Sequence, residues 1–200
     1  TGDLLRTGTK TRTKEQLDKE IDFIGASLST SYNSISASAV SRHKEKLMEL
    51  MSDIILNAEF RQNELDKIIM QTKSGLAAAK EDPNSIANNV RKAAVYGTEH
   101  PYGEIITEES VNRIKIEDCK NYYETFFSPG AAYLAVVGNI SKKEAETLVK
   151  KYLSKWTKKQ IPNFGYKSPS LPKTNTVCLV DRPASVQSVI SVSYPVNLKP

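Results

Sequence analysis

The chain has little histidine, little cysteine and no long apolar run. Two of its 200 residues are histidine and two are cysteine. His43 and His100 each lack a second ligand nearby, so no complete zinc site is expected among these residues. Cys119 and Cys178 are far apart and show no partner pattern, which favours buried thiols over a disulfide or a metal site. Because no run of about 18 apolar residues occurs, no membrane-spanning helix is expected.

Sequence patterns of the common catalytic sites are also missing. There is no glycine-rich phosphate loop, no Gly-x-Ser-x-Gly elbow and no His-Glu-x-x-His pair. The net charge is +5, with 28 Lys and Arg spread along the chain among 23 acidic residues. Basic residues interleaved with acidic ones are typical of a solvated surface, whereas nucleic-acid sites gather them into a patch. The charge pattern therefore argues against a nucleic-acid partner.

The stretch from Asn63 to Gly103 shows the clearest secondary-structure pattern in the sequence. It reads as a long amphipathic helix, a break, a second helix and a turn. Asp82 can cap the second helix, and Pro83 fits the first turn because an N–H there has no helical partner. Gly97 then ends this helix. Apolar residues at helical spacing predict a buried stripe on each helix, namely Leu65, Ile68, Ile69, Leu76 and Ala79, then Ile86, Val90, Ala93 and Ala94.

The residues before this stretch predict short helices and a hairpin. Thr1 to Thr7 reads as the end of a helix. Thr13 and Gln16 form a capping-box pattern for a short helix that stops at a glycine. Alternation from Ala26 to Ser41 predicts a serine-rich antiparallel hairpin. Lys44 to Leu56 has the apolar spacing of a helix with one buried face.

The residues after this stretch predict further helices, three strands and a linker. In chain order we first expect a helical turn from Thr107 or Glu108 to Ile114, a helix from Ile116 to Phe126, a turn at Ser128-Pro129-Gly130 and a buried strand from Ala131 to Gly138. A capping box of Ser141 and Glu144 then begins a helix, with Ala145, Leu148, Val149 and Tyr152 facing inward. Two strands follow, at Thr176 to Asp181 and at Val186 to Tyr194. Ser154 to Lys173 has no period and contains the prolines and lysines of a linker.

Together these elements predict an α+β class, with an antiparallel sheet and helices packed on one of its faces. We expect residues 1–153 to form most of one module, residues 154–173 to be a linker, and residues 174–200 to supply the first strands of a following module. The chain begins on a helix-like segment and stops after a strand-like run, so we also expect a fragment truncated at both ends. Without further information this is an α+β domain of unassigned function.

Several short motifs add a resemblance. They are Leu4 to Thr13, Ile24 to Leu28, Glu81-Asp82-Pro83, Tyr96-Gly97-Thr98, His100-Pro101-Tyr102-Gly103, and Tyr122 through Val137-Gly138-Asn139-Ile140. In order and spacing they resemble a module of the pitrilysin/insulinase family of zinc peptidases, which includes the mitochondrial processing peptidases. The resemblance covers essentially the whole chain. It implies a two-halved clamshell of repeated α+β modules that encloses unfolded peptide between the halves.

In this family one module carries zinc on a His-x-x-Glu-His motif, with a further Glu ligand on the long helix. Counting back from Gly8-Thr9 puts Gly2 in the place of the motif's Glu and Asp3 in that of its second His. Counting back from Asp82-Pro83 puts the third ligand near Gly75, where no carboxylate is found. The resemblance therefore implies no catalytic residue and no metal ligand in this fragment, and zinc in the catalytic half of the parent or partner.

The function that the resemblance implies is that of the non-catalytic half of a two-part zinc metallo-endopeptidase of bacterial type. It would complete the chamber, bind extended peptide through a sheet edge and its basic surface, and hold the half that carries His-x-x-Glu-His. That half would lie upstream in the same chain or in a separate subunit. Arg182 and Gln187 are the candidate peptide-binding residues, although a turn between two strands also accounts for them.

Three alternatives are left open. The module could be an active zinc peptidase with ligands outside this fragment, a structural scaffold subunit, or a nucleic-acid-binding module based on its positive charge. Zinc content tests the first, a co-purifying partner with His-x-x-Glu-His tests the second, and salt-dependent binding of an oligonucleotide tests the third. A soluble protein is expected, and a periplasmic or other extracytoplasmic location would require a signal peptide in the parent.

Overall fold

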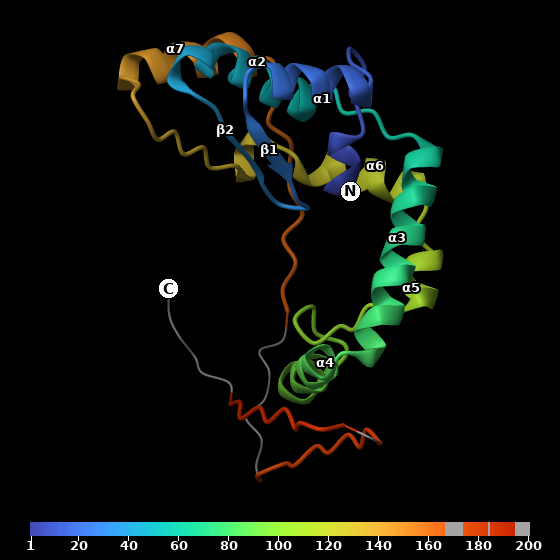
Figure 1. Cartoon of the computed structure of the whole chain (residues 1–200). Coiled ribbons are helices and arrows are strands. Elements are labelled where there is room, and N and C mark those ends of the chain that lie inside the picture. Colours follow the sequence, from blue (N-terminus) through green and yellow to red (C-terminus); the bar gives the residue numbers. More distant parts are fainter. Residues whose placement is uncertain (167–173, 184, 195–200) are drawn as a thin grey trace. The chain divides into compact units, whose positions relative to one another are not determined.

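The computed structural model describes residues 1–166, 174–183 and 185–194. The chain divides into two units, residues 1–68 with 114–162 and residues 69–113 with 163–200, and each is described by itself. Helices predominate, and the described strands form a two-stranded antiparallel sheet (Figure 1). The predicted α+β class is confirmed. Within the described residues, no helix has the length and apolar character that crossing a bilayer requires.

The helices of the first unit follow the sequence pattern closely. The elements of this unit are η1 (Asp3–Arg6), α1 (Lys14–Phe23), β1 (Ser27–Thr30), β2 (Ile35–Ser38), η2 (Ser41–His43), α2 (Lys44–Leu56), α6 (Ile116–Phe126), η3 (Pro129–Ala131) and α7 (Lys142–Leu153). Thr13 Oγ1 accepts a hydrogen bond from the Gln16 N–H, and the Gln16 side chain accepts one from the Thr13 N–H. This capping box confirms the predicted start of α1.

β1 and β2 form a ribbon with two different faces. Leu28 pairs with Ala37 and faces the core. On the opposite face six serines pair across the ribbon, Ser27 with Ser38, Ser29 with Ser36 and Ser31 with Ser34, each at 2.8 Å between hydroxyl oxygens. We call these three pairs the serine ladder. The ribbon confirms the predicted hairpin.

The core of the first unit lies among η1, α1, the ribbon and α2. Its buried members are Leu5, Leu17, Ile21, Ile24, Leu28, Leu50, Ile54 and Ala58. Phe60 and Tyr123 pack against this core, with their ring centroids 5.4 Å apart in an edge-on arrangement. Both side chains are partly buried, and the apolar area that they remove from water keeps α6 with the N-terminal elements.

Helix α7 packs on α2 through ion pairs. Lys44 and Glu144 lie 2.5 Å apart, as do Lys151 and Glu45. Ser141 Oγ accepts a hydrogen bond from the Glu144 N–H, which caps the helix. The Glu144 carboxylate pairs with Lys44, and the side-chain cap by Ser141 confirms the predicted start of α7. The expected inner face is half-buried rather than buried and comprises Ala145, Leu148, Val149 and Tyr152.

The coil after α7 is attached to the C-terminal end of α6. The Trp156 indole N–H donates to the Phe127 carbonyl at 3.2 Å, and the Lys159 backbone N–H donates to Ser128 Oγ at 2.9 Å. Ser128 is 1% exposed, so this hydroxyl holds the coil from inside the unit. The start of the predicted linker is therefore bound to the first unit, and residues 167–173 of that linker lie outside the described residues.

The second unit contains the predicted pair of helices. α3 (Gln62–Glu81) begins in the first unit and continues into the second, followed by α4 (Pro83–Tyr96) and the short α5 (Glu108–Asn112). The Asp82 carboxylate accepts a hydrogen bond from the Ser85 N–H at 2.9 Å and so caps α4. Gly97, with φ of 78°, ends this helix in a backbone conformation that favours glycine. The break and both ends of α4 are as predicted.

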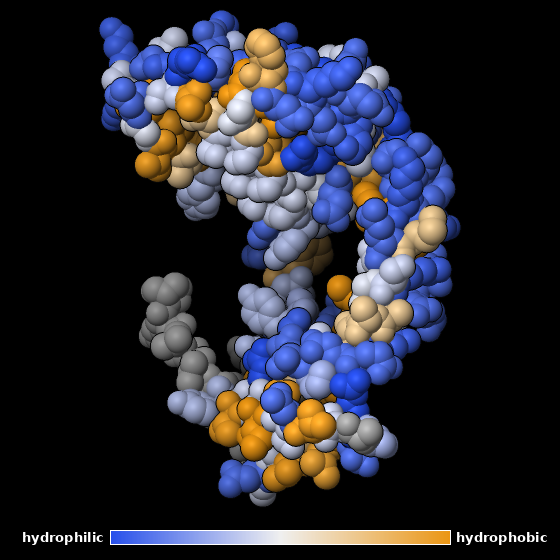
Figure 2. All heavy atoms as spheres, viewed as in Figure 1, coloured by the Kyte–Doolittle hydropathy of each residue, from blue (hydrophilic) through white to orange (hydrophobic). Residues whose placement is uncertain are grey.

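The buried stripes predicted for α3 and α4 are wrong in extent. Leu65 is buried on α3, whereas α4 has no buried residue. Apolar periodicity marks a face that can be buried, but burial also requires a covering surface. Described apolar residues of the C-terminal coil are themselves exposed, as the hydrophobic spheres over this unit in Figure 2 show, and include Val177, Leu179, Val186, Ile190 and Val192.

Three predicted strands are not formed. Residues 131–138, 176–181 and the described part of 186–194 have no strand pairing, and the residues from Ala131 to Asn139 are exposed. A strand needs a neighbour for its backbone N–H and C=O groups, and no described residue supplies one to these segments. Cys178 is exposed and so differs from the expected buried thiol, whereas Cys119 is buried as predicted.

Candidate functional site

Gly2 and Asp3, the positions that the resemblance assigns to the motif's Glu and second His, lie at the start of η1. Gly2 is buried, and a Cβ built on it would lie 2.3 Å from the Ser31 carbonyl carbon and 2.6 Å from the Tyr32 nitrogen. No side chain fits in that space without a backbone shift. Asp3 is exposed in the first turn of η1. Neither residue can therefore act as a buried general base in this conformation.

Gly75, in the position of the third ligand, has different surroundings. It lies on an exposed part of α3, and no atom lies within 4 Å of a Cβ built on it. The fold therefore does not require glycine here. No group of three or more His, Cys, Asp or Glu side chains in the described part of the chain could hold a metal ion. The assignment of Gly2, Asp3 and Gly75 to the motif stays a prediction.

The two histidines have partners of another kind. His100 Nδ1 accepts a hydrogen bond from the Tyr102 N–H at 3.1 Å. Its ring lies 5.4 Å from the Tyr96 and Tyr102 centroids and 5.9 Å from that of Tyr166. His43 Nε2 accepts from Arg42 Nε at 3.1 Å. The His100 turn is thus an aromatic packing cluster.

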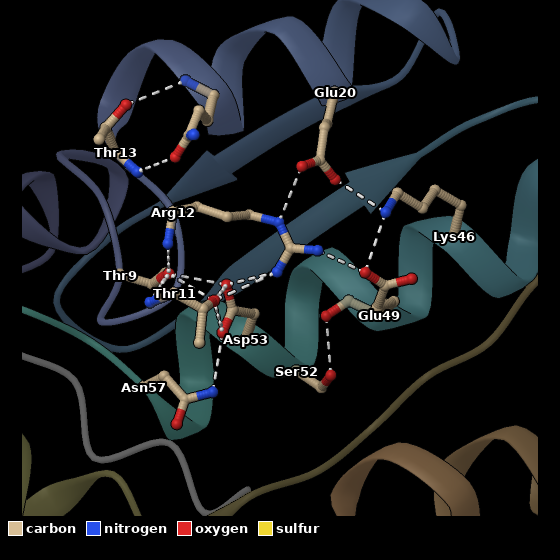
Figure 3. Close-up of polar contacts among 11 residues, drawn as sticks. Thr9, Thr11, Arg12, Thr13, Glu20, Lys46, Glu49, Ser52, Asp53 and Asn57 are labelled. Atoms are coloured by element: carbon tan, nitrogen blue, oxygen red, sulfur yellow. Dashed lines mark hydrogen bonds and ion pairs between the residues drawn. The ribbon is translucent and has the colours of Figure 1, made fainter.

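The most connected polar cluster in the described residues joins the 9–12 loop to α2 (Figure 3). Arg12 contacts Asp53 at 2.8 Å, Glu49 at 2.5 Å and Glu20 at 3.1 Å. Lys46 lies 2.7 Å from the second Glu20 oxygen and 2.9 Å from Glu49. We call this set, completed by Thr9, Thr11 and Asn57, the Arg12 network. It connects the loop and α1 to one side of α2.

Asp53 is the acceptor at the centre of the Arg12 network. It is 6% exposed and accepts hydrogen bonds from Thr9 Oγ1 at 2.7 Å and from Asn57 Nδ2 at 2.7 Å. Burial opposes ionisation of Asp53, but the hydrogen bonds from Thr9, Asn57, Thr11 and Arg12 outweigh it and lower the pKa of the carboxyl group. Because the oxygens of Asp53 already have donors, the network is suited to holding the loop rather than to moving protons.

The Arg12 network was not predicted from the sequence. One local signal was available, because Asp53 is a carboxylate beside Leu50 and Ile54 on the apolar face of α2. A charged residue on a buried face requires a partner. That partner, Arg12, lies 41 residues earlier in the chain, and nothing in the local sequence identifies it.

The candidate peptide-binding residues both lie in the C-terminal coil of the second unit. Arg182 pairs with Glu81 at the end of α3, at 3.2 Å between Nη2 and Oε2. Gln187 is exposed. No contact in the described residues brings the two side chains together, so their role as a site stays a prediction.

Comparison with known proteins adds two family matches. Residues 3–108 match the model described as "Insulinase (Peptidase family M16)", and residues 113–199 match "Peptidase M16 inactive domain". Among curated proteins, the chain is 24% identical over 140 residues to "Uncharacterized zinc protease YmxG" of Bacillus subtilis, covering 67% of this chain and 34% of that protein. It is 25% identical over 156 residues to "Cytochrome b-c1 complex subunit 1, mitochondrial" of Mus musculus, covering 74% and 32%. The chain spans about a third of the length of both relatives.

Solved structures show the same fold. The chain matches the peptidase M16 inactive domain from Pseudomonas fluorescens with a TM-score of 0.74 and 19% identity, over 86% of this chain and 43% of that one. It matches the periplasmic protease PqqL from Escherichia coli with a TM-score of 0.68 and 18% identity, over 85% of this chain and 20% of that one. Since the insulinase model alone matches more than half of the sequence, the chain belongs to the insulinase family, peptidase family M16.

Proposed function

We propose that this chain is part of the non-catalytic half of a two-part zinc metallo-endopeptidase and that it completes a peptide-binding chamber. One observation carries this proposal. In the place of the glutamate that would activate water stands Gly2, whose backbone approaches Ser31 too closely for any side chain. The match of residues 113–199 to the inactive-domain model supports the same role.

Zinc in this proposal belongs to a catalytic half that carries His-x-x-Glu-His, in the same polypeptide or in a separate subunit. Two observations support such a partner. Relatives from Bacillus subtilis and Rickettsia felis are named zinc proteases, and their sequences extend well beyond the region matched here. The substrate would be an extended or unfolded peptide, which a free strand edge can bind through backbone hydrogen bonds. PqqL, whose structure has the same fold, is described as a periplasmic protease, and this supports an extracytoplasmic location for the present chain.

The peptide-binding residues in this proposal are Arg182 and Gln187, at the start of a module formed by residues 174–200. Residues 1–153 form the preceding module, and residues 154–173 join the two. Arg182 would donate to peptide carbonyls or to a carboxylate, and its ion pair with Glu81 orients its guanidinium. Arg182→Ala should weaken peptide binding, whereas Arg113→Ala, which removes an exposed Arg–Glu pair of the same unit, should not.

A second candidate function is that of a structural scaffold subunit. The similarity to subunit 1 of the mitochondrial cytochrome b-c1 complex favours it. In that case the chain would support an assembly without acting on peptide.

One experiment separates these functions. Zinc content and cleavage of a quenched fluorescent peptide library are measured on this chain, on the His-x-x-Glu-His half, and on both together. A zinc-free, silent chain that raises the other half's activity supports the chamber proposal. Stoichiometric zinc with cleavage by this chain would contradict it and favour an active module. Silence with no effect on the other half favours the scaffold.

A further inference from the structure

The first unit has a cleft between the end of α1 and the start of α2. Its volume is about 450 Å³, and it is lined by Lys19, Glu20, Phe23, Ile24, His43 and Lys46. Figure 3 shows Lys46 reaching from α2 to Glu20 of α1, so the Arg12 network forms one wall of the cleft. A space of this size admits one large side chain or a small ligand. The cleft contains none of the residues that the resemblance assigns to the zinc motif, and neither of the candidate peptide-binding residues.

The floor of the cleft is apolar. Phe23 is the last residue of α1 and is 87% exposed, whereas the next residue, Ile24, is buried. The hydrocarbon stems of Lys19 and Lys46 complete this surface, because long cationic side chains keep their charge in water and lay their stems on apolar neighbours. A second ring packed on Phe23 would remove both rings from water, which favours an aromatic occupant.

Two cations beside the cleft have no acidic partner among the described residues. Lys19 is exposed, and neither Asp22, three positions later, nor any other described carboxylate pairs with it. Arg42 donates through Nε to His43 Nε2 at 3.1 Å, and its terminal nitrogens bond to no described residue. The free positive charges, one on α1 and one on η2, therefore attract carboxylates to both sides of the cleft.

The arrangement fits a peptide better than a nucleic acid. A phosphate backbone is bound by many cations along its length, whereas here two free cations flank an apolar floor and the Glu20 carboxylate stands in the wall. A peptide can supply both carboxylates and an apolar side chain from neighbouring residues. The sequence that fits is therefore an aromatic residue with Asp or Glu on both sides.

We infer that this cleft is a docking site for an acidic peptide segment of a partner protein. One aromatic side chain of the segment packs on Phe23 and Ile24, and the carboxylates before and after it pair with Lys19 and Arg42. Three observations carry the inference: an exposed ring at the end of a helix, a cleft with room for a side chain beside it, and two cations without acidic partners. The inference does not rest on the proposed chamber function.

The test is fluorescence anisotropy of a labelled probe peptide, Gly-Glu-Asp-Phe-Glu-Asp-Gly, titrated with the whole chain. One control peptide has alanine in place of phenylalanine, and the other has glutamine and asparagine in place of the acids. We expect the probe to bind and each control to bind at least about ten-fold more weakly, because each control lacks one half of the recognition. Binding of the probe should also weaken as salt is added.

Two pairs of variants locate the site on the chain. Phe23→Ser and Lys19→Glu should each weaken binding of the probe by about ten-fold. Tyr133→Ser is the control for the loss of an exposed ring, since Tyr133 is 103% exposed, and Lys120→Glu is the control for the change in net charge at an exposed helical position. Both controls should bind the probe as the unaltered chain does. All four positions are exposed, so circular dichroism should show the same fold in each variant.

Other outcomes would contradict the inference. No change in anisotropy at millimolar concentration would show that the cleft is not a peptide site. Equal affinity for the probe and its alanine form would exclude the apolar floor as the contact. Equal losses in Lys19→Glu and Lys120→Glu would mean that the probe responds to net charge alone. A dimer of the chain, seen by light scattering and dissociated by the probe, would make the occupant a second copy rather than a partner.

Discussion

Gly2 and Ser31 lie so close that a Cβ on Gly2 would sit 2.3 Å from the Ser31 carbonyl carbon. The contact joins η1 to the turn of the hairpin. The backbone of Gly2 is helical, with φ of −53°, so a side chain is excluded by this contact and not by the backbone conformation.

Gly2→Ala should therefore destabilise the first unit. The added methyl group must displace the hairpin turn, and overpacking of this kind costs about 1–3 kcal/mol. Urea unfolding measures the change. Gly75→Ala is the matched control and should stabilise the chain by about 0.5–1 kcal/mol, because that glycine lies in an exposed helix with free space around it. Equal effects of the two changes would contradict the steric role of Gly2.

Asp53→Ala should destabilise the first unit more than any exposed ion-pair change. The substitution leaves the Arg12 guanidinium, 17% exposed, without its buried carboxylate and leaves Thr9 and Asn57 without their acceptor. Breaking a largely buried pair in this way costs on the order of 3 kcal/mol. Denaturant unfolding gives the value. Arg113→Ala, in an exposed pair, should leave the midpoint unchanged, and a comparable loss there would show that burial is not the cause.

The stability of the first unit should fall on acidification. The pKa of Asp53 is lowered in the folded state, because its hydrogen bonds to Thr9, Asn57, Thr11 and Arg12 outweigh the effect of burial. A lowered folded-state pKa gives stability above the unfolded value of about 4, which is lost as the pH falls through the folded pKa. Unfolding in urea at a series of acidic pH values tests this slope. Asp53→Asn should flatten it, and an unchanged slope would assign it to other carboxylates.

Ser128→Ala should release the coil after α7. Ser128 Oγ accepts the backbone N–H of Lys159 from inside the unit, and alanine would leave that donor unpaired. Trypsin should then cleave faster after Lys155, Lys158 and Lys159. Ser154→Ala, at an exposed position, is the control. Cleavage that is equally slow in both variants would show that the side-chain hydrogen bonds of Trp156 and Lys159 to α6 and Phe127 are enough to hold the coil.

Local patterns predicted those elements whose cause is local. α2 and α6 begin and end where apolar spacing placed them, and α4 begins at its Asp82 cap and ends at Gly97. Residues 131–138 were predicted to form a strand and do not pair with another strand. Their composition is that of a buried strand, but a strand forms only against a partner backbone, and composition does not reveal whether that partner is present.

The site was predictable to a similar extent. Motif spacing directed attention to Gly2, but the contact with Ser31 that makes glycine obligatory depends on how η1 meets the hairpin. The pairing of Arg12 with Asp53 joins a loop to a helix across 41 positions. Neither contact produces a periodic pattern in the sequence, so both could be identified only in the folded structure.

The serine ladder has a consequence for the alignment of the two strands. Serines occupy every second position on both strands, so a slip of two residues would still leave serine opposite serine. Hydroxyl pairing therefore tolerates that error. The apolar face does not select the alignment either, because the same slip would place another apolar residue, Ile35 or Ala39, opposite Leu28. The two-residue turn at Tyr32 and Asn33 thus selects the alignment, and the six hydroxyl groups only reinforce it.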